Sequence, residues 1–185
     1  MEVKGAALAS IPRFVLDTFG KKGFNDWINA LPDLQRDLYR NPVRQEGWFP
    51  LLPMMSGPTR VICDLFYGGD IRGAWEAGRF SADFALHGIY RLFVKLGSVE
   101  SLINRAGVIL PTYYRPSSIR VESAAGKRVK LAIEQFPEMD QIVQSRIAGW
   151  MERAVEISGQ KDVRIEIAKS FLSGDGCTEF DIIWN

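Results

Sequence analysis

The residues of this sequence whose types could support chemistry are one histidine, two cysteines and two glycine-rich segments. His87 lies in an apolar helical stretch, where a buried imidazole with one hydrogen bond and an imidazole that ligates a metal or haem are both open interpretations. Cys63 falls in another helical pattern and Cys177 opens the last expected strand, so their spacing indicates neither a disulfide nor a Cys–His pair. Gly68-Gly69 and Gly174–Gly176 lack the Lys-Ser/Thr that follows in a phosphate-binding loop. We therefore expect no catalytic residue, no metal site and no cofactor, and a chain that is not an enzyme.

Large apolar side chains gather over residues 41–58, which we expect to form an irregular, proline-rich connection. They could cover the helical core, or they could line an adaptable pocket or its lid. Small residues such as Gly73 and Gly78, in the next long helical stretch, could admit a ligand or could let another helix pack closely. We predict an apolar interior cavity with the ligand-binding residues Trp48, Phe49, Leu52, Met55, Phe66, Trp75, Phe80, Phe84 and His87.

The composition is that of a soluble globular protein. The chain has 185 residues, 46% of them hydrophobic and 24% charged, and a formal net charge of +1, which favours one domain over residues 1–185 and gives no electrostatic signal for nucleic acid. No signal peptide and no apolar run long enough for membrane insertion is apparent. Together with two unpaired thiols, these features predict a cytoplasmic protein.

The apolar pattern divides the chain into a helical part (1–116) and a sheet-containing part (117–185). In the first part the period indicates helices near 10–20, 24–31, 33–40, 58–66, 70–95 and 99–106. From residue 117 the period changes to two and predicts a hairpin, which is followed by an amphipathic helix over 138–157 and strands near 163–167 and 177–184. The predicted fold class is α+β, with an N-terminal helical subdomain followed by a β-β-α-β-β antiparallel sheet unit.

This order of elements resembles a superfamily that groups the haem nitric-oxide/oxygen-binding (H-NOX) domains, the 4-vinyl-reductase-type ligand-sensing domains and the TRAPP transport subunits. The resemblance extends over most of the chain. It depends most on Gly149-Trp150 within the 138–157 helix, on Val163–Ile167 after it, and on the closing segment Gly174–Phe180.

The resemblance implies a sensor scaffold, but two family sites do not match. The haem histidine of H-NOX domains should fall near Leu102–Asn104, where no histidine stands. The Tyr-x-Ser-x-Arg motif that contacts the haem propionates should fall near 133–137, which reads Ile-Glu-Gln-Phe-Pro; Ser118 and Arg120 look like a remnant but lack the tyrosine. The zinc-binding cysteine cluster of the 4-vinyl-reductase type is reduced to Cys177. We therefore predict a haem-free member of the superfamily without zinc.

Two functions remain open on these grounds. The first is a non-catalytic binding or sensing domain for a small apolar, amphipathic or lipid-like ligand, which would signal through a partner protein because the sequence contains no recognisable effector. The alternative is a TRAPP-like protein–protein interaction or adaptor module without a ligand. A homodimer is compatible with either function.

Overall fold

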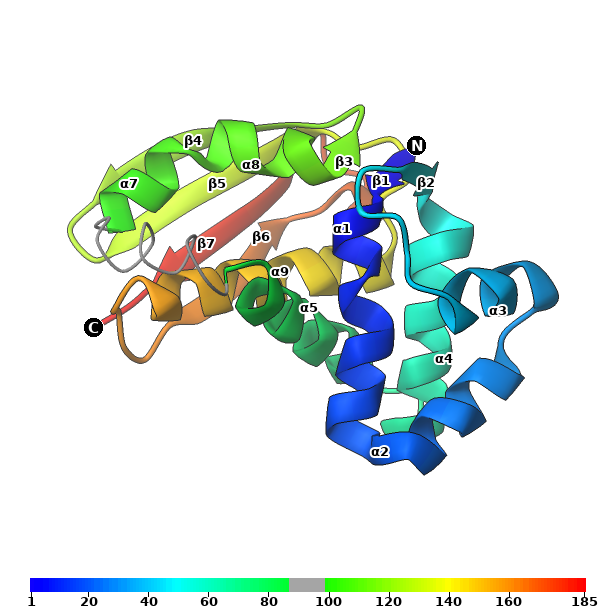
Figure 1. Ribbon diagram of the computed structural model, residues 1–185. Helices are drawn as coiled ribbons and strands as arrows, with labels where there is room; N and C mark the ends of the chain where they lie inside the picture. Colours follow the sequence, from blue (N-terminus) through cyan, green and yellow to red (C-terminus); the bar gives the residue numbers. More distant parts are fainter. Residues whose placement is uncertain (87–98) are drawn as a thin grey trace.

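Helices form most of the first half of the chain, and the strands of the main sheet come after it (Figure 1). This computed structural model describes residues 1–86 and 99–185. The helices and helical turns are α1 (Gly5–Leu8), α2 (Ser10–Ala30), α3 (Asp33–Arg40), η1 (Leu52–Ser56), α4 (Gly57–Phe66), α5 (Arg72–Ala85), α7 (Val99–Asn104), α8 (Ala106–Tyr113), α9 (Gln141–Ile157) and η2 (Phe171–Ser173). The strands are β1 (Glu2–Lys4), β2 (Trp48–Pro50), β3 (Tyr114–Arg115), β4 (Ser118–Ala125), β5 (Arg128–Gln135), β6 (Arg164–Lys169) and β7 (Thr178–Ile183). The predicted α+β class is confirmed.

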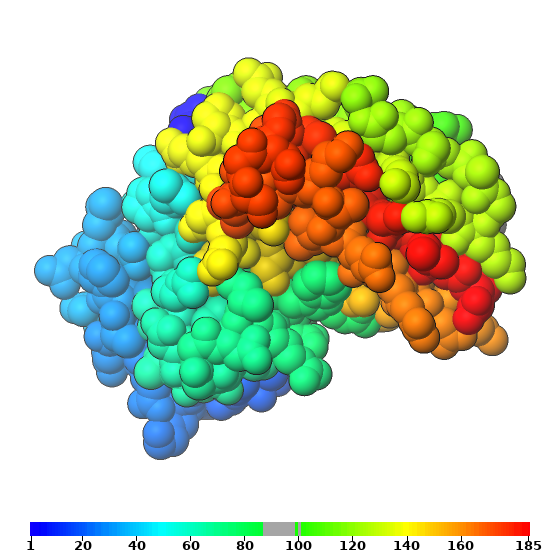
Figure 2. Space-filling model, turned by 180° about the vertical axis from the view of Figure 1, so that it is seen from behind, coloured from blue at the N-terminus to red at the C-terminus, as the bar shows by residue number. Residues whose placement is uncertain are grey.

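The main sheet has four antiparallel strands in the order β4-β5-β7-β6. Its inner face carries the apolar residues of the period-two pattern, such as Val129 and Phe180, which are almost completely buried. Its outer face carries paired charges, and Lys130 and Lys169 both contact Glu179. Figure 2 shows β6 and β7, in orange and red, at the surface of the molecule on this side. The predicted β-β-α-β-β unit, with one apolar and one charged face, is therefore observed.

A small second sheet, in the order β2-β1-β3, joins the N-terminus to the middle of the chain. Val3 is fully buried and pairs with Phe49 on one side and with Tyr114 on the other. The prediction that residues 41–58 are irregular was wrong for this part, because residues 48–50 form β2 and residues 52–56 form the π-helical turn η1. A three-residue strand leaves too short a periodic pattern to recognise in a sequence.

The helices follow the predicted pattern with two differences. The helices expected at 10–20 and 24–31 are one element, α2, with a kink at Gly20, whose φ of 70° is easily reached only by glycine. The helix α8 was not predicted, because Pro111 lies inside it and an internal proline argues against a helix. Of the helix expected over 70–95, the structure shows Arg72–Ala85, and residues 87–95 lie outside the described part. No described helix is long and apolar enough to cross a membrane.

The helices α5 and α9 pack against each other through glycine at two points. A Cβ atom placed on Gly78 would lie 2.1 Å from the carbonyl oxygen of Arg146. One placed on Gly149 would lie 2.2 Å from the carbonyl oxygen of Trp75. Each helix thus presents a glycine to the backbone of the other. Of the two roles considered for the small residues of α5, close helix packing is the one that Gly78 performs.

Alanine at either of these glycines is expected to destabilise the fold. Since the new methyl group would meet backbone rather than a movable side chain, we expect Gly78→Ala and Gly149→Ala each to lower the free energy of unfolding by about 2–3 kcal/mol, measured by urea denaturation. Gly176→Ala is the matched control, because no atom lies within 4 Å of its Cβ position. Equal stability of the three variants would contradict the described contact.

Candidate functional site

A cavity of about 90 Å³ lies between the inner face of the main sheet and the helices α7, α8 and α9. Large apolar side chains from all of these elements form most of its wall, among them Leu102, Ile103, Leu110, Ile147, Met151 and Ile182. Ala6 and Ala7 of α1, together with Ser81 and Ala85 of α5, contribute small residues. A cavity of this size and lining accommodates a small, mainly apolar molecule.

The amphipathic pattern of α9 explains why this helix contributes the largest share of the wall. Ile147, Trp150, Met151, Ala154 and Val155 follow helical spacing and line the cavity together. Asp140 caps the helix, since its side chain accepts a hydrogen bond of 2.7 Å from the backbone N–H of Val143. The position of this wall is therefore determined by the start of α9 and by its glycine contacts with α5.

Arg146 is the charged residue in this wall, and it is only 3% exposed. One of its terminal nitrogens donates a hydrogen bond of 3.2 Å to the hydroxyl of Thr59 on α4, whereas its Nε has no partner. Burial lowers the pKa of Arg146, although the neighbouring Tyr114 and Tyr39 act in the opposite direction. Since an arginine stays protonated in proteins, the lowered pKa expresses the cost of keeping a positive charge away from water.

The hydroxyls of the two neighbouring tyrosines are neutral. Burial raises the pKa of both Tyr39 and Tyr114. Tyr39 donates a hydrogen bond to the carbonyl oxygen of Met54, and Tyr114 donates to the sulfur of Met55 at 3.7 Å. Neither phenol therefore provides a negative charge for Arg146.

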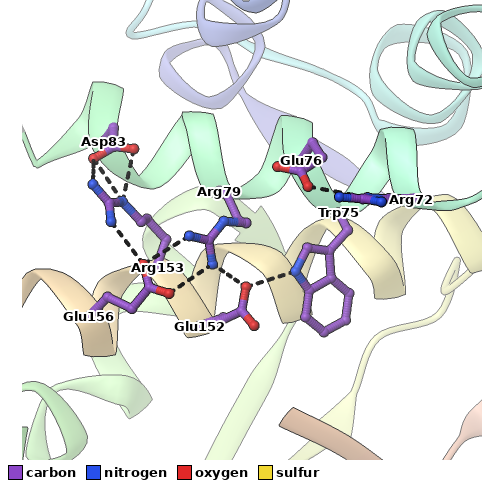
Figure 3. A network of polar contacts seen from close by, with 8 residues as sticks. All are labelled: Arg72, Trp75, Glu76, Arg79, Asp83, Glu152, Arg153 and Glu156. Carbon is purple, nitrogen blue, oxygen red and sulfur yellow. Dashed lines mark hydrogen bonds and ion pairs between the residues drawn. The ribbon is translucent and has the colours of Figure 1, made fainter. Parts of the chain in front are cut away.

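A network of ion pairs joins α5 to α9 (Figure 3). Arg79 contacts both Glu152 and Glu156, and Arg153 contacts Glu156 and Asp83. The indole N–H of Trp75 completes the network with a hydrogen bond of 2.9 Å to Glu152. Burial raises the pKa of Glu156, but hydrogen bonds from Arg79 and Arg153 outweigh it and leave the pKa lowered. These side chains satisfy one another, so we assign them a structural role.

Removing the charge of Glu156 should destabilise the protein at neutral pH but not in acid. A carboxyl whose folded pKa is lowered stabilises the fold above its unfolded pKa of about 4.3 and ceases to do so as the pH falls through the folded value. We expect Glu156→Gln to cost about 1 kcal/mol at pH 7, with the difference from wild type closing below about pH 4. Urea denaturation across this range measures the effect, and Glu46→Gln, at an exposed position, is the control. A difference that is constant with pH would exclude this role.

Eight of the nine residues predicted from the sequence to bind a ligand lie away from this cavity. The ring of Trp48 contacts the charged groups of Lys4 and Arg115, which lie 4.7 and 4.0 Å from the ring centre. Phe49 is half-buried in β2, and Leu52 is 38% exposed. Met55 is buried beneath Tyr114. These four side chains thus lie away from the cavity.

The remaining predicted residues are on the helices. Phe66 stacks on Phe19 with ring centres 4.0 Å apart, and Phe80 packs against Phe14 at 5.5 Å. Trp75 lines a shallow polar depression on α5, and Phe84 is 39% exposed. His87 lies outside the described residues. None of the other eight predicted residues lines the cavity, so their role as ligand contacts remains a prediction.

The sequence contains one feature that indicates the cavity wall, although it belongs to no catalytic motif. Arg146 stands four residues after Ile142 and four before Trp150, within the apolar stripe of the predicted helix. A charge in such a stripe is unusual, because arginine is seldom buried without a partner. The α8 residues of the wall gave no comparable signal.

Comparison with solved structures relates this fold to H-NOX domains. An H-NOX protein from S. oneidensis in the Fe(II)NO ligation state superposes with a TM-score of 0.74 at 12% sequence identity, covering 98% of this chain and 99% of that one. The Fe(II) unliganded H-NOX protein from K. algicida superposes with a TM-score of 0.69 at 14% identity, covering 98% and 96%. No known family profile and no curated protein sequence matches the chain. At this level of identity the likeness shows that the fold is H-NOX-like.

The described cavity lining does not fit haem. It contains no histidine, and the stretch in which the resemblance would place the haem ligand contributes Leu102 and Ile103 instead. The volume of about 90 Å³ is also below the roughly 300 Å³ at which sites for larger organic ligands begin. Over residues 1–86 and 99–185, no group of three or more histidine, cysteine or acidic residues is arranged to hold a metal ion.

Proposed function

We propose that this chain is a sensor domain of H-NOX-like fold that binds a small apolar or amphipathic molecule in the cavity between α9, α7–α8 and the main sheet. In this proposal residues 1–185 form one domain that acts by binding, without haem or zinc, and not by catalysis. The observation that carries the proposal is the cavity itself, because its wall is built mainly from apolar side chains of α7, α8, α9 and the main sheet.

The apolar lining supports a binding role over a catalytic one. Ile103, Leu110, Ile147 and Ile182 provide contact area but no group that exchanges protons or attacks a substrate. The fold supports a sensing role, since the similar solved structures are H-NOX proteins studied in defined ligation states of iron. With Leu102 and Ile103 in the wall, we propose that an organic ligand replaces the haem.

Signalling would then require a partner protein. We propose that ligand binding changes how α7 and α8 lie against α9, since the cavity is bounded by these elements. Another protein can respond to such a change only if the ligand binds two arrangements of these helices with different affinity.

Native mass spectrometry of protein purified from its own host tests the proposal. We expect a bound small organic molecule that organic solvent extracts and that its mass identifies. Ala154→Leu should reduce its occupancy, because the added carbon atoms would enter the cavity from a wall position. Ala124→Leu is the control, since Ala124 is exposed on β4.

The absorption spectrum of the same sample tests whether the protein binds haem. We expect no Soret band in the absorption spectrum, before or after incubation with haemin and reductant. Stoichiometric haem would overturn the haem-free part of the proposal. Protein without any bound molecule, whose side chains fill the cavity, would overturn the binding function.

A further inference from the structure

Arg146 lines the cavity and has no negatively charged partner among the described residues. It is nine-tenths or more buried, and the hydroxyl of Thr59 satisfies one of its donors. Its Nε–H has no acceptor. A buried guanidinium presents five N–H donors in one plane, so most of its capacity for hydrogen bonding is unused by these residues.

Such an arrangement is costly unless a ligand completes it. A charge removed from water is stabilised by a counter-ion that is removed with it, and the neighbouring Tyr39 and Tyr114 are neutral phenols. The carboxylates of α5 and α9 do not serve, because they pair with other arginines: Glu76 with Arg72, and the remaining three with Arg79 and Arg153 (Figure 3). Arg146 therefore lacks a counter-ion, and an anionic ligand in the cavity could provide one.

The shape of the group and the size of the cavity restrict the ligand further. The planar fork of a guanidinium matches the two oxygens of a carboxylate. A phosphate monoester carries about −1.5 to −2 charges at neutral pH, more than one arginine compensates. The rest of the wall, including Ile103, Leu110 and Ile147, is apolar and suits a hydrocarbon body.

We propose that the cavity selects a small monocarboxylate with an apolar body, such as a short-chain aliphatic acid. Its carboxylate pairs with Arg146, and its hydrocarbon part lies against the α8 and α9 side chains. This inference rests on the proposed function, and it adds the chemical class of the ligand.

Titration calorimetry with three probes tests the inference on the full chain. Sodium hexanoate has both a hydrocarbon chain and a carboxylate. The probe 1-hexanol has the hydrocarbon chain without the charge, and acetate has the carboxylate with almost no hydrocarbon chain. We expect wild-type protein to bind hexanoate at least about tenfold more tightly than 1-hexanol, which is a modest value for a hydrogen bond to a charged group. Acetate should bind most weakly.

Substitution of Arg146 identifies the source of this preference. Arg146→Met should bind hexanoate no better than 1-hexanol, and Arg146→Lys should retain part of the preference. Arg60→Met, at an exposed position of α4, should behave as wild type. If Arg146→Met does not fold, the affinities of wild-type protein for hexanoate and 1-hexanol still test whether the cavity prefers a carboxylate.

The outcomes separate the two proposals. Equal affinity of wild-type protein for hexanoate and 1-hexanol would overturn the monocarboxylate inference and leave the binding function intact. A preference for hexanoate that persists in Arg146→Met would overturn the assignment to Arg146. Binding of none of the three probes would count against both the inference and the proposed binding cavity.

Discussion

The close approach of α5 and α9 determines where every other part of the candidate site lies. Gly78 and Gly149 each face the backbone of the opposite helix, so the two helices cannot slide or rotate without a steric clash. Arg146 and Trp75 provide the backbone carbonyls at these contacts. The contact thereby fixes the residues of α9 that follow Arg146 against the inner face of the sheet, and a space remains where α7 and α8 close over them.

The polar side chains near the contact of α5 with α9 differ in how far their charges are compensated. The network of Arg79, Glu152, Arg153 and Glu156 spans α5 and α9 with each charge compensated (Figure 3). Partly exposed pairs of this kind add little individually and mainly specify alignment. Arg146 is different, because its charge is buried and uncompensated by the described residues.

The sequence predicted most of the fold, whereas the residues that line the cavity are not among the predicted ligand contacts that the structure describes. The change of apolar period at residue 117 predicts the sheet and α9, because these elements are long enough to repeat a pattern. The strands β1 and β2 have three residues each and show no such pattern. The predicted site residues, such as Trp48 and Phe66, are large side chains that fill space. The cavity is instead a space that side chains from segments distant in the sequence leave unfilled. Its position depends on tertiary packing, which Gly78 and Gly149 control and which residue types alone do not reveal.

The central claim is that an apolar cavity exists between α7–α8 and α9, and diffraction from a crystal pressurised with xenon tests it most directly. Xenon enters apolar cavities that water leaves empty. The account predicts a xenon site in contact with Ile103, Leu110 and Ile147, or, if a natural ligand is already bound there, electron density for that ligand at the same position. Side chains that fill this space and exclude both would contradict the account.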